Sequence, residues 1–165
     1  MNLFIREVKN KKDLKTFIYL PEKIHKDQPG WVHPLYGDDF HFFDRDKNKS
    51  FQSSEVVLLL AWEGSKAVGR IMGIINTRYN ELRGEKNARF CFLECYNDFI
   101  IAQTLIQSVE AWALSKEMTH LIGPLGFSDK EPQGMLTEGF EQEVVIATNY
   151  NFPWLPDFLH VLGFS

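Results

Sequence analysis

The sequence predicts an α/β fold in which helices flank a mixed central β-sheet. Residues 89–124 contain an apolar strand, an amphipathic helix and a second short strand. This order is typical of a β-α-β unit, whose parallel strands need a long crossover connection. Residues 56–62 and 67–76 are two apolar runs joined by a short connection with Gly64, which predicts an antiparallel hairpin. Parallel and antiparallel pairs together make a mixed sheet.

The first part of the chain predicts one strand and one helix. Residues 4–8 alternate apolar and charged side chains, as in a half-buried strand. Asp13 is expected to cap the following helix, and Pro21 to end or kink it. A turn-rich loop comes next, and we expect Trp31 and Leu35 to fold inward and anchor it.

The middle of the chain continues the sheet. Gly69 and Gly73 inside the second hairpin strand indicate a bulge or a close backbone approach, as occurs where a ligand lies against a strand. Residues 79–86 are expected to form a polar loop. The amphipathic helix after the strand at residues 89–94 can be capped by Asn97 or Asp98.

The last part of the chain is less regular. Residues 119–123 predict a short strand. Residues 127–149 are too long for a simple turn, so we expect either a lid or a small hairpin. Residues 152–162 predict a final helix with Pro153 near its start.

Composition limits the class of protein. The 165 residues fit one domain, and 44% are hydrophobic and 24% charged, as in a globular chain. The longest apolar run, residues 56–62, is too short to span a membrane. A net charge of −4 argues against nucleic-acid binding. Charged residues precede any hydrophobic stretch, unlike a secretory signal, so we expect a cytoplasmic protein.

No metal site or disulfide is predicted. Cys91 and Cys95 lie about 13 Å apart on an extended strand, so they cannot bond to each other and are expected to be buried thiols. Residues 44–55 resemble a calcium-binding loop, but Lys49 stands where that loop needs Gly, and a strand follows. We expect a solvated loop there. The histidines, including His25, follow no ligand spacing and are expected at the surface or satisfied within loops.

Three segments carry a family resemblance: the hairpin at residues 62–70, the helix at 102–113 and Leu-Gly-Phe at 162–164. With the order of elements, they make the chain similar to the GNAT superfamily of acyl-CoA N-acyltransferases. Together with residues 29–35 and 123–127, they make it resemble an uncharacterised bacterial subgroup of that superfamily. The resemblance implies two further strands, so either the chain is a fragment that lacks the last strands or the sheet is completed differently. We expect residues 1–165 to form a single GNAT-like domain and, in the fragment alternative, to be the N-terminal part of a longer protein.

The cofactor loop of the family is altered here. In the family, an Arg/Gln-x-x-Gly-x-Gly/Ala loop after the fourth strand binds the CoA pyrophosphate through backbone amides. This motif falls on residues 97–102, where only Ala102 fits. Ile100 replaces a Gly, and Asp98 brings negative charge to the helix start, so sterics and charge both oppose ordinary CoA binding.

The resemblance also implies site residues. Glu94 is the candidate catalytic base, with a structural carboxylate as the alternative. Cys95 could be a nucleophile at a helix start or a buried small side chain. The candidate contacts of acetyl-CoA or another acyl-CoA are Cys95, Tyr96, Asn97, Ala102 and Asn151. Tyr150 and Asn151 precede the last helix, where Asn151 could instead be a helix cap. Leu159 replaces a Tyr that often protonates departing CoA in the family.

Two functions follow from these expectations. One is transfer of an acyl group from acyl-CoA to an unknown small amine. The other is a catalytically degenerate GNAT-like domain that binds a ligand or an interaction partner, and Asp98 and Ile100 favour it. The expected partners are a small-molecule amine or another ligand, and either a second domain or a second copy of the chain.

Overall fold

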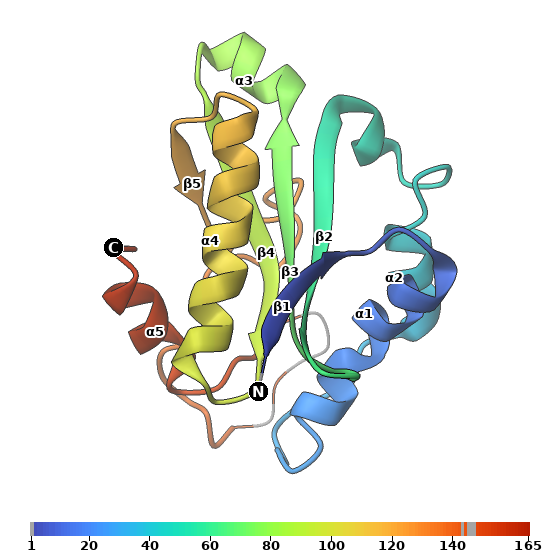
Figure 1. Cartoon of the computed structure of the whole chain (residues 1–165), viewed down its shortest axis with the longest axis vertical. Coiled ribbons are helices and arrows are strands. Elements are labelled where there is room, and N and C mark those ends of the chain that lie inside the picture. Colours follow the sequence, from blue (N-terminus) through green and yellow to red (C-terminus); the bar gives the residue numbers. More distant parts are fainter. Residues whose placement is uncertain (1, 143, 145–147) are drawn as a thin grey trace.

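The computed structural model describes residues 2–142, 144 and 148–165 and shows a five-stranded mixed sheet between helices (Figure 1). The strands lie in the order in which they occur in the chain. The first four are antiparallel and the fifth is parallel to the fourth. The strands are β1 (Leu3–Glu7), β2 (Ser54–Glu63), β3 (Lys66–Asn76), β4 (Asn87–Cys95) and β5 (His120–Ile122). The predicted α/β class, the hairpin and the β-α-β unit are confirmed.

Helices pack on both faces of this sheet. The helices are α1 (Lys11–Ile24), α2 (Tyr36–Phe42), α3 (Thr77–Arg83), α4 (Phe99–Ser115) and α5 (Leu155–Val161), and a 3-10 helix spans Lys49–Ser53. Helices α4 and α5 cover one face, while α1 and α2 lie against the other (Figure 1). Within the described ranges, no helix has the length and apolar character needed to cross a membrane.

Strand β2 is apolar without interruption from residue 56 to residue 62, because its middle is buried on both faces. Leu59 and Ala61 belong to the core under α4, whereas Leu58 and Leu60 belong to the core under α1. A strand covered on one face would alternate apolar and polar side chains, but a strand covered on both does not.

Gly69 and Gly73 on β3 let helix α4 approach the sheet closely. A Cβ atom at Gly69 would lie 2.8 Å from Cδ1 of Leu105 and 2.9 Å from Cγ2 of Ile101. A Cβ at Gly73 would lie 3.0 Å from the Trp112 ring. The close approach to the β3 backbone that the sequence predicts is therefore confirmed, but the group that approaches is helix α4 and not a ligand.

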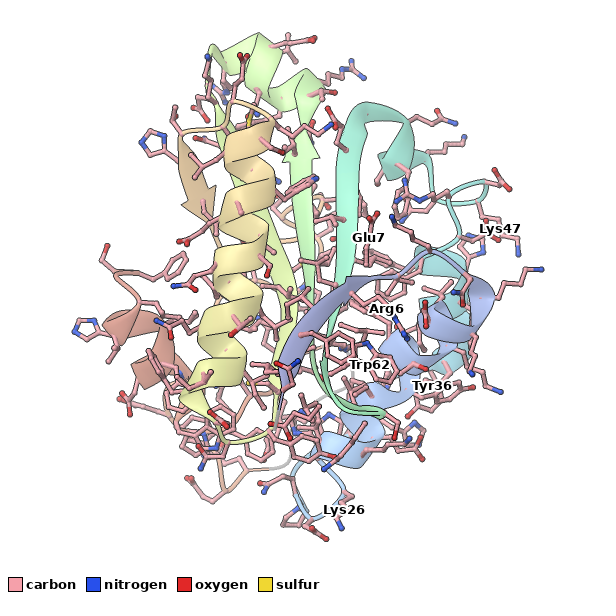
Figure 2. The ribbon with its side chains drawn as sticks, in the orientation of Figure 1. Arg6, Glu7, Lys26, Tyr36, Lys47 and Trp62 are labelled. Carbon is pink, nitrogen blue, oxygen red and sulfur yellow. The ribbon has the colours of Figure 1, made fainter. Side chains whose placement is uncertain are left out.

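Helix α1 begins and continues differently from the prediction. Asn10 is its cap, with the side chain accepting a hydrogen bond from the Asp13 backbone N–H at 2.9 Å. Asp13 instead accepts a hydrogen bond from Arg6 at 2.8 Å, and Arg6 also lies 4.3 Å above the Trp62 ring (Figure 2). Pro21 does not end the helix, which runs on to Ile24 with one helical hydrogen bond fewer.

Three further sequence expectations are wrong. Leu35 is not an inward anchor, since it precedes α2 and is 57% exposed. Most of residues 79–86 are helical, because the Asn76 side chain caps α3 by accepting from the Tyr79 N–H. In the last helix, the proline of the first turn is Pro156 and not Pro153.

We expect Gly69→Val to lower the free energy of unfolding by about 1–3 kcal/mol, because the added atoms overpack the contact with α4. Urea denaturation measures this change. Gly37→Ala is the matched control: a Cβ atom there would meet nothing within 4 Å and the residue is in α2, so this change should be neutral or stabilising. Equal effects of the two substitutions would contradict close packing at Gly69.

Candidate functional site

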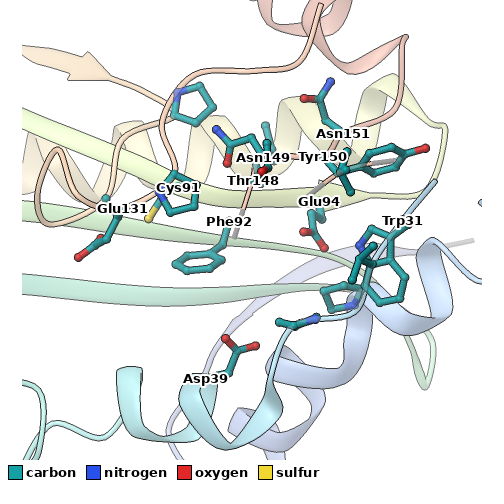
Figure 3. Close-up of a pocket in the computed structure, with 18 of the residues that line it drawn as sticks. Trp31, Asp39, Cys91, Phe92, Glu94, Glu131, Thr148, Asn149, Tyr150 and Asn151 are labelled. Atoms are coloured by element: carbon teal, nitrogen blue, oxygen red, sulfur yellow. The ribbon is translucent and has the colours of Figure 1, made fainter. Parts of the chain in front are cut away.

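A cavity of about 510 Å³ lies on the face of the sheet that carries α1 and α2. Its walls come from the end of α1, the loop before α2, and α2 itself, and from Arg70 of β3 and the second half of β4. Residues between 124 and 135 and residues 148–151 also line the cavity (Figure 3). Most of the lining is apolar. The buried or partly buried charged side chains in it are Asp39, Arg70, Glu94 and Glu131.

A bulge in β4 shapes the floor of the cavity. The register with β3 shifts between Arg70 and Met72, and Phe92 has a φ of 53°, which is rare for a bulky side chain. As a result, the consecutive residues Cys91 and Phe92 pack on the same side of the sheet. Beyond the bulge, Glu94 points into the cavity (Figure 3).

Strands β4 and β5 separate next to this bulge. Their pairing ends at Arg89 and Ile122, and one further bond runs from the Leu125 N–H to the Phe90 carbonyl at 2.8 Å. In the described part of the chain, the rest of β4 up to Cys95 has no β5 partner. An open strand edge therefore runs beside the cavity.

Arg70 connects Glu94 to helix α1. It is 4% exposed; its Nη1 donates to the Phe17 carbonyl at 2.8 Å, and its Nη2 donates to Glu94 Oε1 at 3.4 Å. In a regular helix, the Phe17 carbonyl would accept from the N–H of residue 21, but Pro21 has none. The carbonyl that proline leaves free is the one that Arg70 uses.

His25 lies next to Glu94 but does not line the cavity. It is 1% exposed, and its ring stacks between Trp31 and Phe152 at centroid distances of 5.3 and 4.7 Å. Its Nε2 is 3.8 Å from Glu94 Oε2, and neither ring nitrogen has a hydrogen-bond partner among the described residues. Burial lowers the pKa of His25, Glu94 raises it and Arg70 lowers it, which favours a neutral ring. The prediction of a surface or satisfied histidine is wrong here.

Asp39 faces Glu94 across the cavity. Its carboxylate points from α2 toward the strand that carries Phe92 and Glu94 (Figure 3). Burial raises the pKa of Asp39, the nearby Arg70 lowers it and Glu94 raises it. No ion pair to Asp39 occurs within the described ranges. The sequence did not identify this residue.

Two of the predicted site residues line the cavity. Glu94, the candidate base, is one. Asn151 is the other, but its amide is already engaged: it accepts from the Leu136 N–H at 2.7 Å and donates to the Leu136 carbonyl at 3.1 Å. Asn151 is therefore not the cap of α5. Tyr150 also lines the cavity and donates from its hydroxyl to Gln28 at 3.2 Å.

The other predicted cofactor contacts lie elsewhere. Cys95 and Ala102 are buried in the core under α4, Asn97 is exposed, and Tyr96 lines a separate groove, where Lys66 lies 4.1 Å from its ring centre. As cofactor contacts, these four stay predictions. Burial, with Asp98 and Glu94, raises the pKa of Cys95 to about 12, so the nucleophile alternative is not supported.

The start of α4 is as the sequence predicted. Asp98 is the cap, and its Oδ1 accepts from the Ile100 N–H at 2.8 Å. Its carboxylate thus occupies the position where the helix would favour an external anion. Among the described residues, no group of three side chains could hold a metal ion.

Curated proteins similar in sequence are longer than this chain. Protein YghO of Escherichia coli (strain K12) is 28% identical over 165 aligned positions, covering 97% of this chain and 41% of that protein. The bacterial ceramide synthase of Caulobacter vibrioides (strain NA1000 / CB15N) is 28% identical over 151 positions, covering 91% and 39%. The chain therefore spans about two fifths of the length of these relatives. No protein-family model matches it.

Solved structures share the arrangement of elements. A tandem GNAT protein from the clavulanic acid biosynthesis pathway has a TM-score of 0.60 at 14% identity, covering 98% of this chain and 43% of that chain. Aminoglycoside N-acetyltransferase AAC(6')-Iy, solved in complex with CoA, has a TM-score of 0.55 at 17% identity, covering 99% and 88%. At such identities, the likeness concerns the fold.

We expect Arg70→Leu to lower the free energy of unfolding by about 3–5 kcal/mol, because it leaves Glu94 without a positive partner and the Phe17 carbonyl without a donor. Adding Glu94→Gln should recover part of this loss. Chemical denaturation of the two single variants and the double variant measures the coupling. Strictly additive losses would show that Arg70 stabilises the fold without Glu94.

Proposed function

We propose that this chain, which has the fold of the GNAT acyltransferases, transfers an acyl group from an acyl-CoA thioester to the nitrogen of a primary amine. One observation carries the proposal: Glu94 lies where the open edge of β4 meets the cavity. A thioester placed along the strand edge would be adjacent to an amine in the cavity, with a carboxylate within reach of both.

Glu94 is proposed as the base for this reaction. A primary amine is protonated near neutral pH and must lose a proton before its nitrogen can attack. Glu94 Oε2 has no hydrogen-bond partner in the described chain, so it is free to accept that proton, while Oε1 is held by Arg70. The new C–N bond then replaces the C–S bond, and CoA leaves as its thiol after taking up a proton.

The comparisons support amide formation in general terms. The relative from Caulobacter vibrioides is named a ceramide synthase, and a ceramide is an amide. AAC(6')-Iy is an N-acetyltransferase that was solved with CoA. The acyl donor proposed here is therefore acetyl-CoA or another acyl-CoA.

Asp98 favours a second candidate function, a GNAT-like domain that binds a ligand or partner without catalysis. Its carboxylate lies at the helix start, where a diphosphate would otherwise bind. The curated relatives are more than twice as long as this chain, so a second domain or a second copy could complete the site. The two functions differ in whether the chain uses CoA thioesters.

Glu94→Gln should lower the rate of acyl transfer by about 10²–10⁴-fold, since the amide cannot accept the proton. Release of free CoA thiol from an acyl-CoA, with octylamine as acceptor, measures the rate. The matched control is Glu131→Gln, a carboxyl in the same cavity whose Oε2 accepts from the Phe127 N–H. It should change the rate only a few-fold. Full activity of the Glu94 variant would exclude Glu94 as the base.

Asp98→Ser should raise the affinity for CoA by up to about fivefold, because serine caps the helix without a negative charge near the phosphates. Adding Ile100→Gly, which removes a 54% exposed side chain, should raise it further. Isothermal titration with CoA measures both changes. If the unmodified chain binds CoA as tightly as the variants, Asp98 does not hinder diphosphate binding, and the second candidate loses its support.

A further inference from the structure

We infer that the acceptor for this cavity is a primary amine with one positive charge and an apolar chain, whose ammonium group lies between Glu94 and Asp39. This inference rests on the proposed acyl transfer for the amine's role as acceptor. The binding itself depends only on the chemistry of the cavity, which has a charged end and apolar walls.

The charged end suits a single ammonium ion. With both carboxyls ionised, Glu94 and Asp39 contribute two negative charges, and Arg70 contributes one positive charge. His25 lies outside the cavity lining, and burial lowers its pKa, which favours the neutral ring. The net charge of −1 matches one ammonium group. An ammonium beside Asp39 would also offset the cost of burying that carboxyl, which has no ion-pair partner among the described residues.

Unused polar atoms in this region support a polar ligand group. Glu94 Oε2, Arg70 Nε and both His25 nitrogens are buried without hydrogen-bond partners in the described chain. Arg70 and His25 are 4% and 1% exposed. Of these atoms, Glu94 Oε2 belongs to a side chain that lines the cavity, and as an acceptor it suits an ammonium N–H. Arg70 Nε is itself a donor, and His25 does not line the cavity, so these atoms do not bind the ammonium.

The walls suit an apolar chain. They are made largely of Trp31, Val32, Pro34, Leu35, Phe42, Phe92, Pro124, Pro132 and Met135. A cavity of 150 Å³ can hold benzene, so about 510 Å³ has room for about 20 non-hydrogen atoms. Val32 and Leu35 remain 46% and 57% exposed, which leaves apolar surface at the mouth that a protruding chain would cover.

Acceptors with many charges or hydroxyl groups fit less well. The other partly buried carboxyl of the cavity, Glu131, already accepts from the Phe127 N–H at 2.7 Å and lies near Arg89. Asp38 is exposed to water. Among the described residues, a second ammonium group would therefore have no free buried carboxylate, and hydroxyls against the aromatic walls would lose their hydrogen bonds to water.

Calorimetric titration of the chain near neutral pH with octylamine, butylamine, octanol and octanoate tests the inference without any acyl donor. Octylamine should bind tightest. Each methylene buried should tighten binding about fourfold, so octylamine should bind about 100-fold or more tighter than butylamine. Equal binding of butylamine and octylamine would overturn the apolar chain. Octanol binding as tightly as octylamine would overturn the ammonium group, and tighter binding of octanoate would make the cavity an acyl-chain site.

Variants locate the ammonium group. Asp39→Asn should weaken octylamine binding about tenfold or more and leave octanol binding unchanged, because only the amine loses a charged partner. The matched control is Asp38→Asn, the neighbouring carboxyl, which also lines the cavity but is exposed to water, so the substitution should change amine binding less than twofold. If the two variants weaken octylamine binding equally, Asp39 does not hold the ammonium.

An activity assay separates this inference from the proposed function. Octylamine that binds as expected but is never acylated from any acyl-CoA would support the binding site and refute the transfer. Acylation of ethanolamine or spermidine as fast as octylamine at equal low concentration would support the transfer and refute the apolar-chain acceptor.

Discussion

The candidate site depends on one hydrogen bond, which the Arg70 guanidinium donates to the backbone carbonyl of Phe17. A buried guanidinium is costly unless its donors are satisfied, and a regular helix offers no free carbonyl in its interior. Pro21 provides one, because it continues α1 without an N–H to bond Phe17. The same guanidinium then holds Glu94, so a helix on one side of the cavity determines where the carboxylate on the strand lies.

Most of the fold could be predicted from local patterns. The hairpin, the β-α-β unit and the Asp98 cap follow from apolar periodicity and capping chemistry, which act over a few residues. Local patterns left open whether Pro21 ends or kinks α1, and the helix continues past it to Ile24. The reason is a contact between residues 17 and 70, far apart in the sequence, that compensates for the missing hydrogen bond.

The site was less predictable than the fold. Glu94 was identified through the family resemblance, from its place at the end of a strand, but His25 follows α1 and Asp39 lies on α2, so they meet Glu94 only in three dimensions. One signal was present in strand β3. After its first residue, Arg70 is the one charged side chain in this strand, and a buried charge needs a partner. The expectation that Cys95 is a buried thiol is confirmed, because α4 packs on the face of β4 that carries it. Its role as a cofactor contact stays a prediction.

The unpaired edge of β4 also matters for a molecule that has not yet bound a ligand. A strand with free N–H and C=O groups can pair with a strand of another molecule, which is how many sheet proteins self-associate. In the described residues, this edge is bordered by the cavity and not by a neighbouring strand. An extended ligand lying there would complete the sheet, so occupancy would also protect the chain against aggregation.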